Sequence, residues 1–239
     1  MSEKSLIGKV ALISGGSRGL GKSVAIKFLQ AGASVMICAR SKTELSQAHT
    51  ELKSLCIHGQ MIESLECDVS NEEEVALLID DTLAKLGGCH ILVNNAGIYG
   101  PKGLTENNDW AAWKKSFDIN VFGSVLLCRG LIPHFRAQNY GKIIQLSGGG
   151  ATSPLPRLSA YAASKAAIVR YIETISRELK GTGIDVNSIA PGALNTGMLD
   201  EILDAGPSIV GEVFYEKSKQ QEKSGGASLD NAAALICML

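Results

Sequence analysis

The chain has 239 residues, of which 45% are hydrophobic and 20% charged, and its formal net charge is −1. This length and composition suit one globular domain with a single substantial core. A near-neutral charge gives no general attraction to nucleic acid or to an anionic membrane, so we expect neither as a partner. We also find no apolar run of about 18 residues, the length that a membrane span needs.

The six cysteines form no CxxC pair and follow no regular spacing. The histidines are equally scattered, so we expect no metal site and no disulfide framework. Cysteines inside apolar runs act as small hydrophobic residues, which suits a reducing, cytoplasmic setting. The N-terminal stretch, residues 1–14, carries no signal-peptide pattern.

Apolar runs of strand length alternate with amphipathic helical stretches along the chain. Continuous apolar strands that alternate with helices predict an α/β fold, in which a doubly wound parallel sheet carries helices on both faces in a Rossmann-like arrangement. The predicted strands are 9–14, 34–39, 60–67, 90–94, 142–147 and 185–190, and the predicted helices are 20–31, 42–55, 71–86, 109–138 and 159–179.

No linker or repeat divides the chain, so residues 1–239 are predicted to form one dinucleotide-binding domain. Residues 196–226 are less regular and end in a polar, glycine-containing stretch. They are interpreted as a helical lid over the substrate. Residues 229–239 read as a helix that stops abruptly, where a sheet of this kind normally continues into another strand. We therefore expect a truncated C-terminus.

A glycine-rich turn with the spacing GxxxGxG follows the first predicted strand. Glycines at such a turn allow close approach to a pyrophosphate, and the amides and dipole of the next helix favour its charge. The alternative is a strand–helix turn that binds nothing, but the position in the first βα unit favours the phosphate site. The candidate contacts are Gly15, Ser17, Arg18, Gly19, Leu20 and Gly21.

The second predicted strand ends without the carboxylate that NAD-specific sites use to bind ribose hydroxyls. Arg40 and Ser41 follow it instead, and Arg18 lies in the glycine turn. Two arginines at one corner favour a 2′-phosphate, which a guanidinium binds through a planar pair of donors. The sequence therefore favours NADP(H) as the cofactor. The alternative is that each arginine is a solvated surface residue.

Further motifs appear in order: Asp68-Val69, the NNAG run at 94–97, Asn120, the YxxxK pair at 161 and 165, and a Pro-Gly run from 191. With the glycine turn, they make the chain from about 8 to 196 resemble the short-chain dehydrogenase/reductase family. The resemblance implies that three further groups of residues bind the cofactor. Asp68 and Val69 would contact the adenine, Asn95, Ala96 and Gly97 would line the channel, and Pro191, Gly192 and Thr196 would hold the carboxamide.

Tyr161 and Lys165 are four residues apart, so on a helix they share a face. A free phenol titrates too high for proton transfer at neutral pH, but a nearby ammonium and a positive nicotinamide favour the phenolate. Tyr161 is the candidate acid and base, and Lys165 would also bind the nicotinamide ribose. The resemblance implies that Asn120 holds a water that connects Lys165 to solvent.

One position departs from the family pattern. The usual catalytic serine stands about thirteen residues before the tyrosine, and here that position is Gly148. Removing one such donor costs roughly a hundred- to a thousand-fold in rate in other enzymes. Ser147, Thr152, Ser159 and the amides of the glycine run are candidate replacements, although strand alternation should point Ser147 to the opposite face. A substrate whose shape requires glycine is the other explanation.

We therefore expect an enzyme that transfers a hydride between NADP(H) and a small carbonyl or alcohol substrate. An alternative is a regulatory or scaffold protein that binds the dinucleotide with little turnover, which Gly148 alone favours. A second alternative is an epimerase or dehydratase acting on a sugar-like substrate with the same Tyr–Lys chemistry. In the resembled family the two long helices pair across two-fold axes, so we also expect a homodimer or homotetramer.

Overall fold

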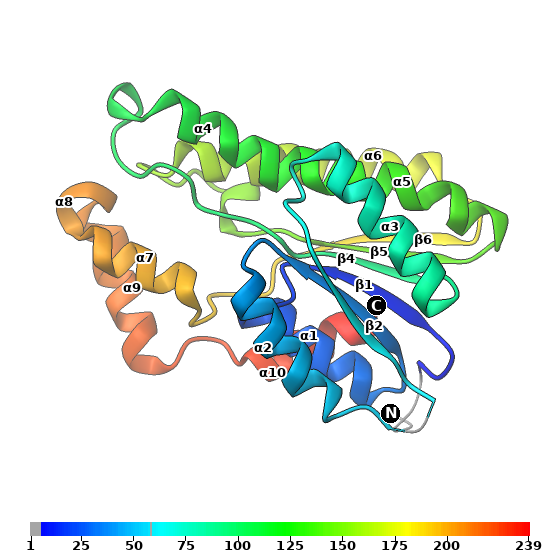
Figure 1. Ribbon diagram of the computed structural model, residues 1–239. Helices are drawn as coiled ribbons and strands as arrows, with labels where there is room; N and C mark the ends of the chain where they lie inside the picture. Colours follow the sequence, from blue (N-terminus) through cyan, green and yellow to red (C-terminus); the bar gives the residue numbers. More distant parts are fainter. Residues whose placement is uncertain (1–5, 58) are drawn as a thin grey trace.

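A six-stranded parallel sheet organises the computed structural model, which describes residues 6–57 and 59–239 (Figure 1). Residues 1–5 of the N-terminal stretch lie outside the described residues. The strand order is β3-β2-β1-β4-β5-β6. The chain adds β2 and β3 on one side of β1 and then adds β4, β5 and β6 on its other side. The predicted doubly wound sheet is confirmed. The strands are β1 (Val10–Ser14), β2 (Ser34–Ala39), β3 (Ile62–Glu66), β4 (Ile91–Asn94), β5 (Gly141–Leu146) and β6 (Ile184–Ile189).

Helices cover both faces of the sheet, and the two sets are clear in Figure 1. Alternate strand residues supply two separate cores: Leu12 packs under one set of helices and Ile13, next to it, under the other. One face carries α1 (Gly19–Gln30), α2 (Lys42–Lys53) and α10 (Leu229–Cys237); the other carries α3 (Glu72–Leu86), α4 (Trp110–Phe117), α5 (Gly123–Ala137) and α6 (Ser159–Glu178).

The predicted helix 109–138 is one continuous helical path with a wide turn inside it. A π-helical segment, Asp118–Phe122, joins α4 to α5. Such a turn accommodates one extra residue and often marks a functional position. Here it places Asn120 inside the protein, with no exposed surface.

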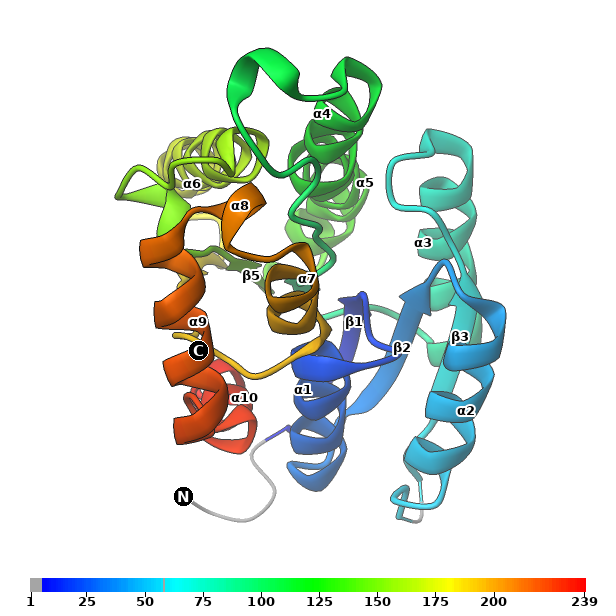
Figure 2. The ribbon, with the colours of Figure 1, turned by 90° about the vertical axis from the view of Figure 1, so that its left-hand side faces the viewer.

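The predicted lid region folds into three short helices, namely α7 (Gly197–Ala205), α8 (Pro207–Val210) and α9 (Glu212–Ser224). Figure 2 shows these helices in front of the sheet, between α6 on one side and α1 on the other. We call residues 197–224 the flap. A 3-10 turn in the loop after β5, Gly149–Ala151, lies close to the start of α6.

The last helix, α10, packs along α1. Within residues 6–57 and 59–239, β6 forms one edge of the sheet and no strand follows α10. A search of those same residues finds no helix with the length and apolar character of a membrane span.

Candidate active site

The glycine turn between β1 and α1 is packed so tightly that two positions cannot carry a side chain. Gly15 has a φ of +66°, and a Cβ there would lie 3.0 Å from Asn95 Nδ2 and 3.1 Å from Ala96 Cα. A Cβ on Gly21 would collide with the Gly15 carbonyl oxygen. The turn therefore brings the NNAG segment and the start of α1 together, as a close-approach phosphate site requires.

The amides at the start of α1 are available to an anion. Arg18 is the N-cap residue but makes no side-chain cap, and no acidic side chain lies in the first turn. Asn95 braces the turn from behind, because its Nδ2 donates to the Ser14 and Gly15 carbonyl oxygens at 3.0 Å each. The first-turn N–H groups of α1 thus point at a site that fits a pyrophosphate. Ser17 and Leu20 are buried in this turn.

The corner next to β2 contains an acidic residue that the sequence analysis did not single out. Arg18 Nη1 lies 3.3 Å from Glu44 Oε1, in an ion pair exposed to solvent. Ser41 caps α2 by accepting from the Glu44 amide at 3.4 Å, and Arg40 is exposed beside it. The corner therefore holds two guanidinium groups and one carboxylate. Because Arg18 and Glu44 are 26 residues apart, only the folded chain reveals their contact.

Asp68, at the end of β3, is held by Ser70 and by Lys115 on α4. Its Oδ1 accepts from the Ser70 hydroxyl at 2.6 Å, and its Oδ2 lies 3.1 Å from Lys115 Nζ. Burial raises the pKa of Asp68, but the hydrogen bonds from Ser70 and the Lys115 ammonium outweigh it, so the pKa is lowered overall. Val69 is buried against Gly123, and a Cβ on Gly123 would lie 2.8 Å from Val69 Cγ2.

The loop after β6 lies beside the glycine turn. Gly192 has a φ of +90°, and Pro191 stands before it in this loop. Thr196 is the N-cap residue of α7, and its Cγ2 would lie 3.5 Å from a Cβ on Gly19. The residues expected at the phosphate and carboxamide ends of the cofactor are therefore brought together from opposite parts of the sequence.

Tyr161 and Lys165 both lie on α6, and both side chains are buried. Lys165 Nζ donates to the Leu146 carbonyl oxygen at the end of β5 over 3.0 Å, and it lies 5.7 Å from the centre of the Tyr161 ring. Burial without a carboxylate partner lowers the pKa of Lys165 to about 8. The lysine is thus fixed under the tyrosine, between β5 and α6.

The prediction that the pKa of Tyr161 is lowered is wrong for the protein without a bound cofactor. Burial, and then the neighbouring Tyr99, raise the pKa of Tyr161 above its ordinary value. The Lys165 ammonium does not offset this, because it bonds to the Leu146 carbonyl and sits under the ring. Burial disfavours the charged phenolate, so the surrounding side chains keep Tyr161 protonated.

Both the oxygen and the nitrogen of the Asn120 side-chain amide form hydrogen bonds within the protein. Its Oδ1 accepts from the Ile98 amide at 2.8 Å, and its Nδ2 donates to the Ile98 carbonyl and to the Ser164 hydroxyl at 2.9 Å each. A Cβ on Gly97 would lie 3.2 Å from Asn120 Oδ1 and 3.5 Å from Lys165 Nζ. Asn120 therefore ties the loop after β4 to α6 directly above the lysine.

The position of the missing serine is occupied by the tyrosine. A Cβ on Gly148 would collide with the Tyr161 hydroxyl, whereas a Cβ on Gly149 would meet nothing within 4 Å. Ser147 is half-buried, and its amide donates to the Ile189 carbonyl at 2.8 Å. Within residues 6–57 and 59–239 the Ser147 hydroxyl makes no hydrogen bond to Tyr161.

An apolar cluster connects Tyr161 to the flap. Leu158, Tyr161, Ile202 and Val210 form its buried centre. Tyr99, in the loop after the NNAG segment, packs edge-to-face on Tyr161 with the ring centres 4.7 Å apart. The sequence analysis missed this residue, because its contact with Tyr161 joins positions far apart in the sequence. The other members are Leu155, Met198, Ala205, Phe214 and Tyr215.

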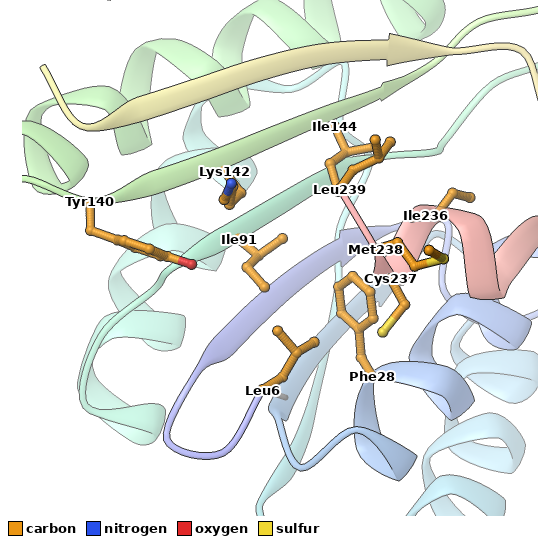
Figure 3. Close-up of a pocket in the computed structure, with 10 residues that line it drawn as sticks. All are labelled: Leu6, Phe28, Ile91, Tyr140, Lys142, Ile144, Ile236, Cys237, Met238 and Leu239. Carbon is orange, nitrogen blue, oxygen red and sulfur yellow. The ribbon is translucent and has the colours of Figure 1, made fainter. Parts of the chain in front are cut away.

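A cavity of about 390 Å³ lies elsewhere, at the opposite end of the strands (Figure 3). It is bounded by the starts of β4 and β5 and by the end of α10, and Figure 3 shows mostly apolar side chains around it. It contains none of the candidate site residues. The candidate site residues lie instead at the carboxyl ends of the strands, where α/β sheets bind ligands at the reversal of strand order. The lining residues are Leu6, Phe28, Ile91, Tyr140, Lys142, Ile144, Ile236, Cys237, Met238 and Leu239.

Comparison with known proteins agrees with this geometry. The family described as short chain dehydrogenase matches residues 9–206. The chain belongs to the short-chain dehydrogenase/reductase family. The family consists of oxidoreductases that use a nicotinamide cofactor and a small-molecule substrate, which establishes the general class of this protein.

Individual relatives align with nearly the whole length of this chain. The 7alpha-hydroxysteroid dehydrogenase of Escherichia coli (strain K12) is 33% identical over 232 residues, which are 97% of this chain and 88% of that protein. A metagenomic short-chain oxidoreductase solved with NADP is 27% identical, with a TM-score of 0.79 over 98% of this chain and 91% of that one. NAD+-bound xylitol dehydrogenase shares the fold, with a TM-score of 0.89 at 24% identity, over 99% of this chain and 93% of that one.

Proposed function

We propose that this protein transfers a hydride between NADP(H) and a carbonyl or alcohol substrate, with Tyr161 as the acid and base. The observation that carries the proposal is the burial of Tyr161 and Lys165 on one face of α6, next to the end of β5. That position lies across the strand ends from the glycine turn, which fits a pyrophosphate. A relay of this kind has no use in a protein that only binds a dinucleotide.

The bound nicotinamide would supply or accept the hydride. The residues of the chain would do the rest. The Tyr161 hydroxyl would give its proton to the carbonyl oxygen as the carbon is reduced, and would take it back in the oxidative direction. Lys165 would bind the nicotinamide ribose hydroxyls. Its ammonium does not by itself offset the burial of the phenolate, which would be stabilised only once the positive charge of the oxidised nicotinamide is also present. Asn120 would act as a positioning residue, because it fixes Ile98 and Ser164 above Lys165.

NADP(H) rather than NAD(H) is proposed because Arg18, in the glycine turn, and Arg40, directly after β2, follow the two segments expected to form the ribose corner. Guanidinium groups recognise a 2′-phosphate through paired donors. The NADP-bound relative supports the same choice. Titration with NADPH and NADH, on wild type and Arg40→Ala, tests it: the preference for NADPH should be lost in the variant.

Activity is tested by following NADPH oxidation with acetophenone, cyclohexanone and benzaldehyde, with Tyr161→Phe as the control. Turnover that the tyrosine variant loses supports the proposal. NADPH binding without turnover on any carbonyl would instead support the second candidate, a regulatory binding protein, which Gly148 favours. Product analysis with a sugar-like substrate separates the epimerase or dehydratase alternative.

The proposed enzyme is also expected to form a homodimer or homotetramer. Trp110 and Phe122 expose 63% and 53% of their surface along α4 and the π-helical segment. Large exposed apolar side chains on neighbouring helical segments favour self-association. Light scattering of the purified protein tests this expectation.

A further inference from the structure

The carbonyl-binding position lacks the side-chain donor that a serine would supply. Gly148 has no hydroxyl, and the space for a side chain there is filled by the hydroxyl end of Tyr161. A carbonyl oxygen that gains negative charge is strongly stabilised by a second preorganised donor. A side chain that replaces the serine would have to lie near Tyr161.

The nearby Ser and Thr hydroxyls are poorly placed for this task. Ser159 Oγ accepts from Trp113 Nε1 at 3.2 Å and from Asn108 Nδ2 at 3.4 Å, so it faces the α4 side. Thr152 is exposed on the loop after β5. Ser164 donates to the Tyr161 carbonyl at 2.8 Å, inside α6.

Tyr99 is the polar side chain in direct contact with the Tyr161 ring. Their ring centres are 4.7 Å apart, with the planes at 61°. Such an edge-to-face pair fixes the relative orientation of the two rings. Tyr99 is half-buried at the edge of the apolar cluster under the flap, and Lys102 Nζ lies 5.7 Å from the centre of its ring.

The backbone on both sides of Tyr99 is held rigidly. Asn120 binds both the amide and the carbonyl of Ile98, at 2.8 and 2.9 Å. Gly100 has a φ of +71°, and a Cβ there would collide with the Ser116 hydroxyl on α4. The loop is thus clamped immediately before and after Tyr99, which is the preorganisation that a stabilising donor needs.

The Tyr99 hydroxyl is protonated. It makes no hydrogen bond to any of residues 6–57 and 59–239, although the side chain is half-buried. Burial, and then the Glu201 carboxylate, raise the pKa of Tyr99. A phenol in this state can donate a hydrogen bond throughout the neutral range.

We propose that Tyr99 is a second catalytic residue, whose hydroxyl donates a hydrogen bond to the substrate oxygen in place of the missing serine. This rests on the proposed function. During reduction the carbonyl carbon gains the hydride and the carbonyl oxygen gains the Tyr161 proton. Tyr99 keeps its own proton and only stabilises the charge that develops on the oxygen. In oxidation the same bond would hold the alcohol oxygen.

The test compares Tyr99→Phe with Tyr215→Phe, because both tyrosine side chains pack against the same apolar cluster. The probes are NADPH with acetophenone or cyclohexanone, whichever the wild type reduces faster. We expect Tyr99→Phe to lower kcat about 10- to 100-fold, somewhat less than the loss of a main oxyanion donor. NADPH affinity should stay within about twofold, and Tyr215→Phe should change neither quantity. The deuterium isotope effect on hydride transfer should increase in Tyr99→Phe, because the chemical step slows.

A second variant, Tyr99→Leu, separates the hydroxyl from the ring. Equal kcat losses in Tyr99→Phe and Tyr99→Leu support the donor role, whereas a loss only in Tyr99→Leu assigns Tyr99 to packing and overturns the proposal. Unchanged kcat in Tyr99→Phe, with Tyr161→Phe inactive, also overturns it while leaving the proposed function intact. A wild type that binds NADPH but reduces no carbonyl overturns the proposed function itself.

Discussion

The Tyr161 hydroxyl fills the space that a Cβ at Gly148 would need. The glycine is therefore more than a lost serine: it determines where the tyrosine sits. A substitution that restores a side chain at 148 must displace the proposed acid and base.

Gly148→Ala should lower kcat about 10-fold or more, since a displacement of about 1 Å in a catalytic group costs on the order of a hundred-fold. NADPH affinity should change little. Gly149→Ala is the matched control, because a Cβ there would meet nothing within 4 Å. Steady-state kinetics of the two variants measure the difference. Equal activities would show that the contact does not position Tyr161.

Lys165→Met should make the cofactor-free protein more stable at pH 7, although it removes activity. Lysine ordinarily titrates at 10.5 and here at about 8, so below pH 8 the folded state carries a buried charge that the unfolded state solvates. The gain is up to about 3 kcal/mol, at 1.36 kcal/mol per pKa unit.

This gain depends on pH in a defined direction. Between about pH 8 and 10.5 the unfolded state binds more protons than the folded state, so wild-type stability rises with pH. Urea unfolding at pH 7 and pH 9.5 should therefore show a smaller advantage of Lys165→Met at the higher pH. Lys180→Met, on an exposed residue, is the control. An advantage that does not change with pH would contradict the account.

Glu44→Gln should increase affinity for NADPH severalfold and leave NADH nearly unchanged. The carboxylate holds Arg18 at 3.3 Å and would repel a 2′-phosphate at the same corner. The pair is largely exposed, so the effect on protein stability should be small. Fluorescence titration with both cofactors measures it. Weaker NADH binding in Glu44→Gln would instead mean that Glu44 binds the ribose hydroxyls, as in NAD-specific sites.

Arg157→Ala should loosen the flap. Arg157 Nη1 donates to the Ser208 and Ile209 carbonyls at 2.8 and 3.1 Å, and its own carbonyl accepts from the Gly103 amide at 2.9 Å. Its φ of 67° is strained for arginine, so other contacts must hold it there.

Losing the two guanidinium bonds should increase proteolytic cleavage in the flap about 10-fold or more, since bonds to a charged group contribute roughly 1.5–3 kcal/mol. KM for the carbonyl should rise with it. Arg170→Ala, whose side chain is 81% exposed, is the control. Cleavage at the wild-type rate would contradict a clamping role for Arg157.

The sequence predicted most of the fold because buried parallel strands leave a strong local pattern. The ends of β2 agree with the prediction, and the other strands differ by one or two residues, where hydrogen-bonding partners decide the boundary. The π-helical turn at Asn120 was not predictable, since one extra residue in a helix leaves no mark in hydrophobic periodicity.

The candidate site was predictable only where a motif marks it. The spacing from Tyr161 located Gly148, but it gave no sign of the contact between them. Tyr99, Glu44 and Arg157 escaped notice because each acts through a partner distant in sequence, namely Tyr161, Arg18 and the flap carbonyls. Such contacts depend on how the loops at the strand ends converge, which no local pattern records.

The central claim is tested most directly by following the hydride itself. The protein is incubated with NADPH that carries deuterium at both C4 positions and with a reducible ketone, and the alcohol is analysed by mass spectrometry for wild type and Tyr161→Phe. The account predicts deuterium on the carbinol carbon with wild type and at least a hundred-fold less product with the variant, on the order of what removal of a catalytic acid costs. Bound NADPH with no deuterated alcohol from wild type, or equal yields from both proteins, would contradict it.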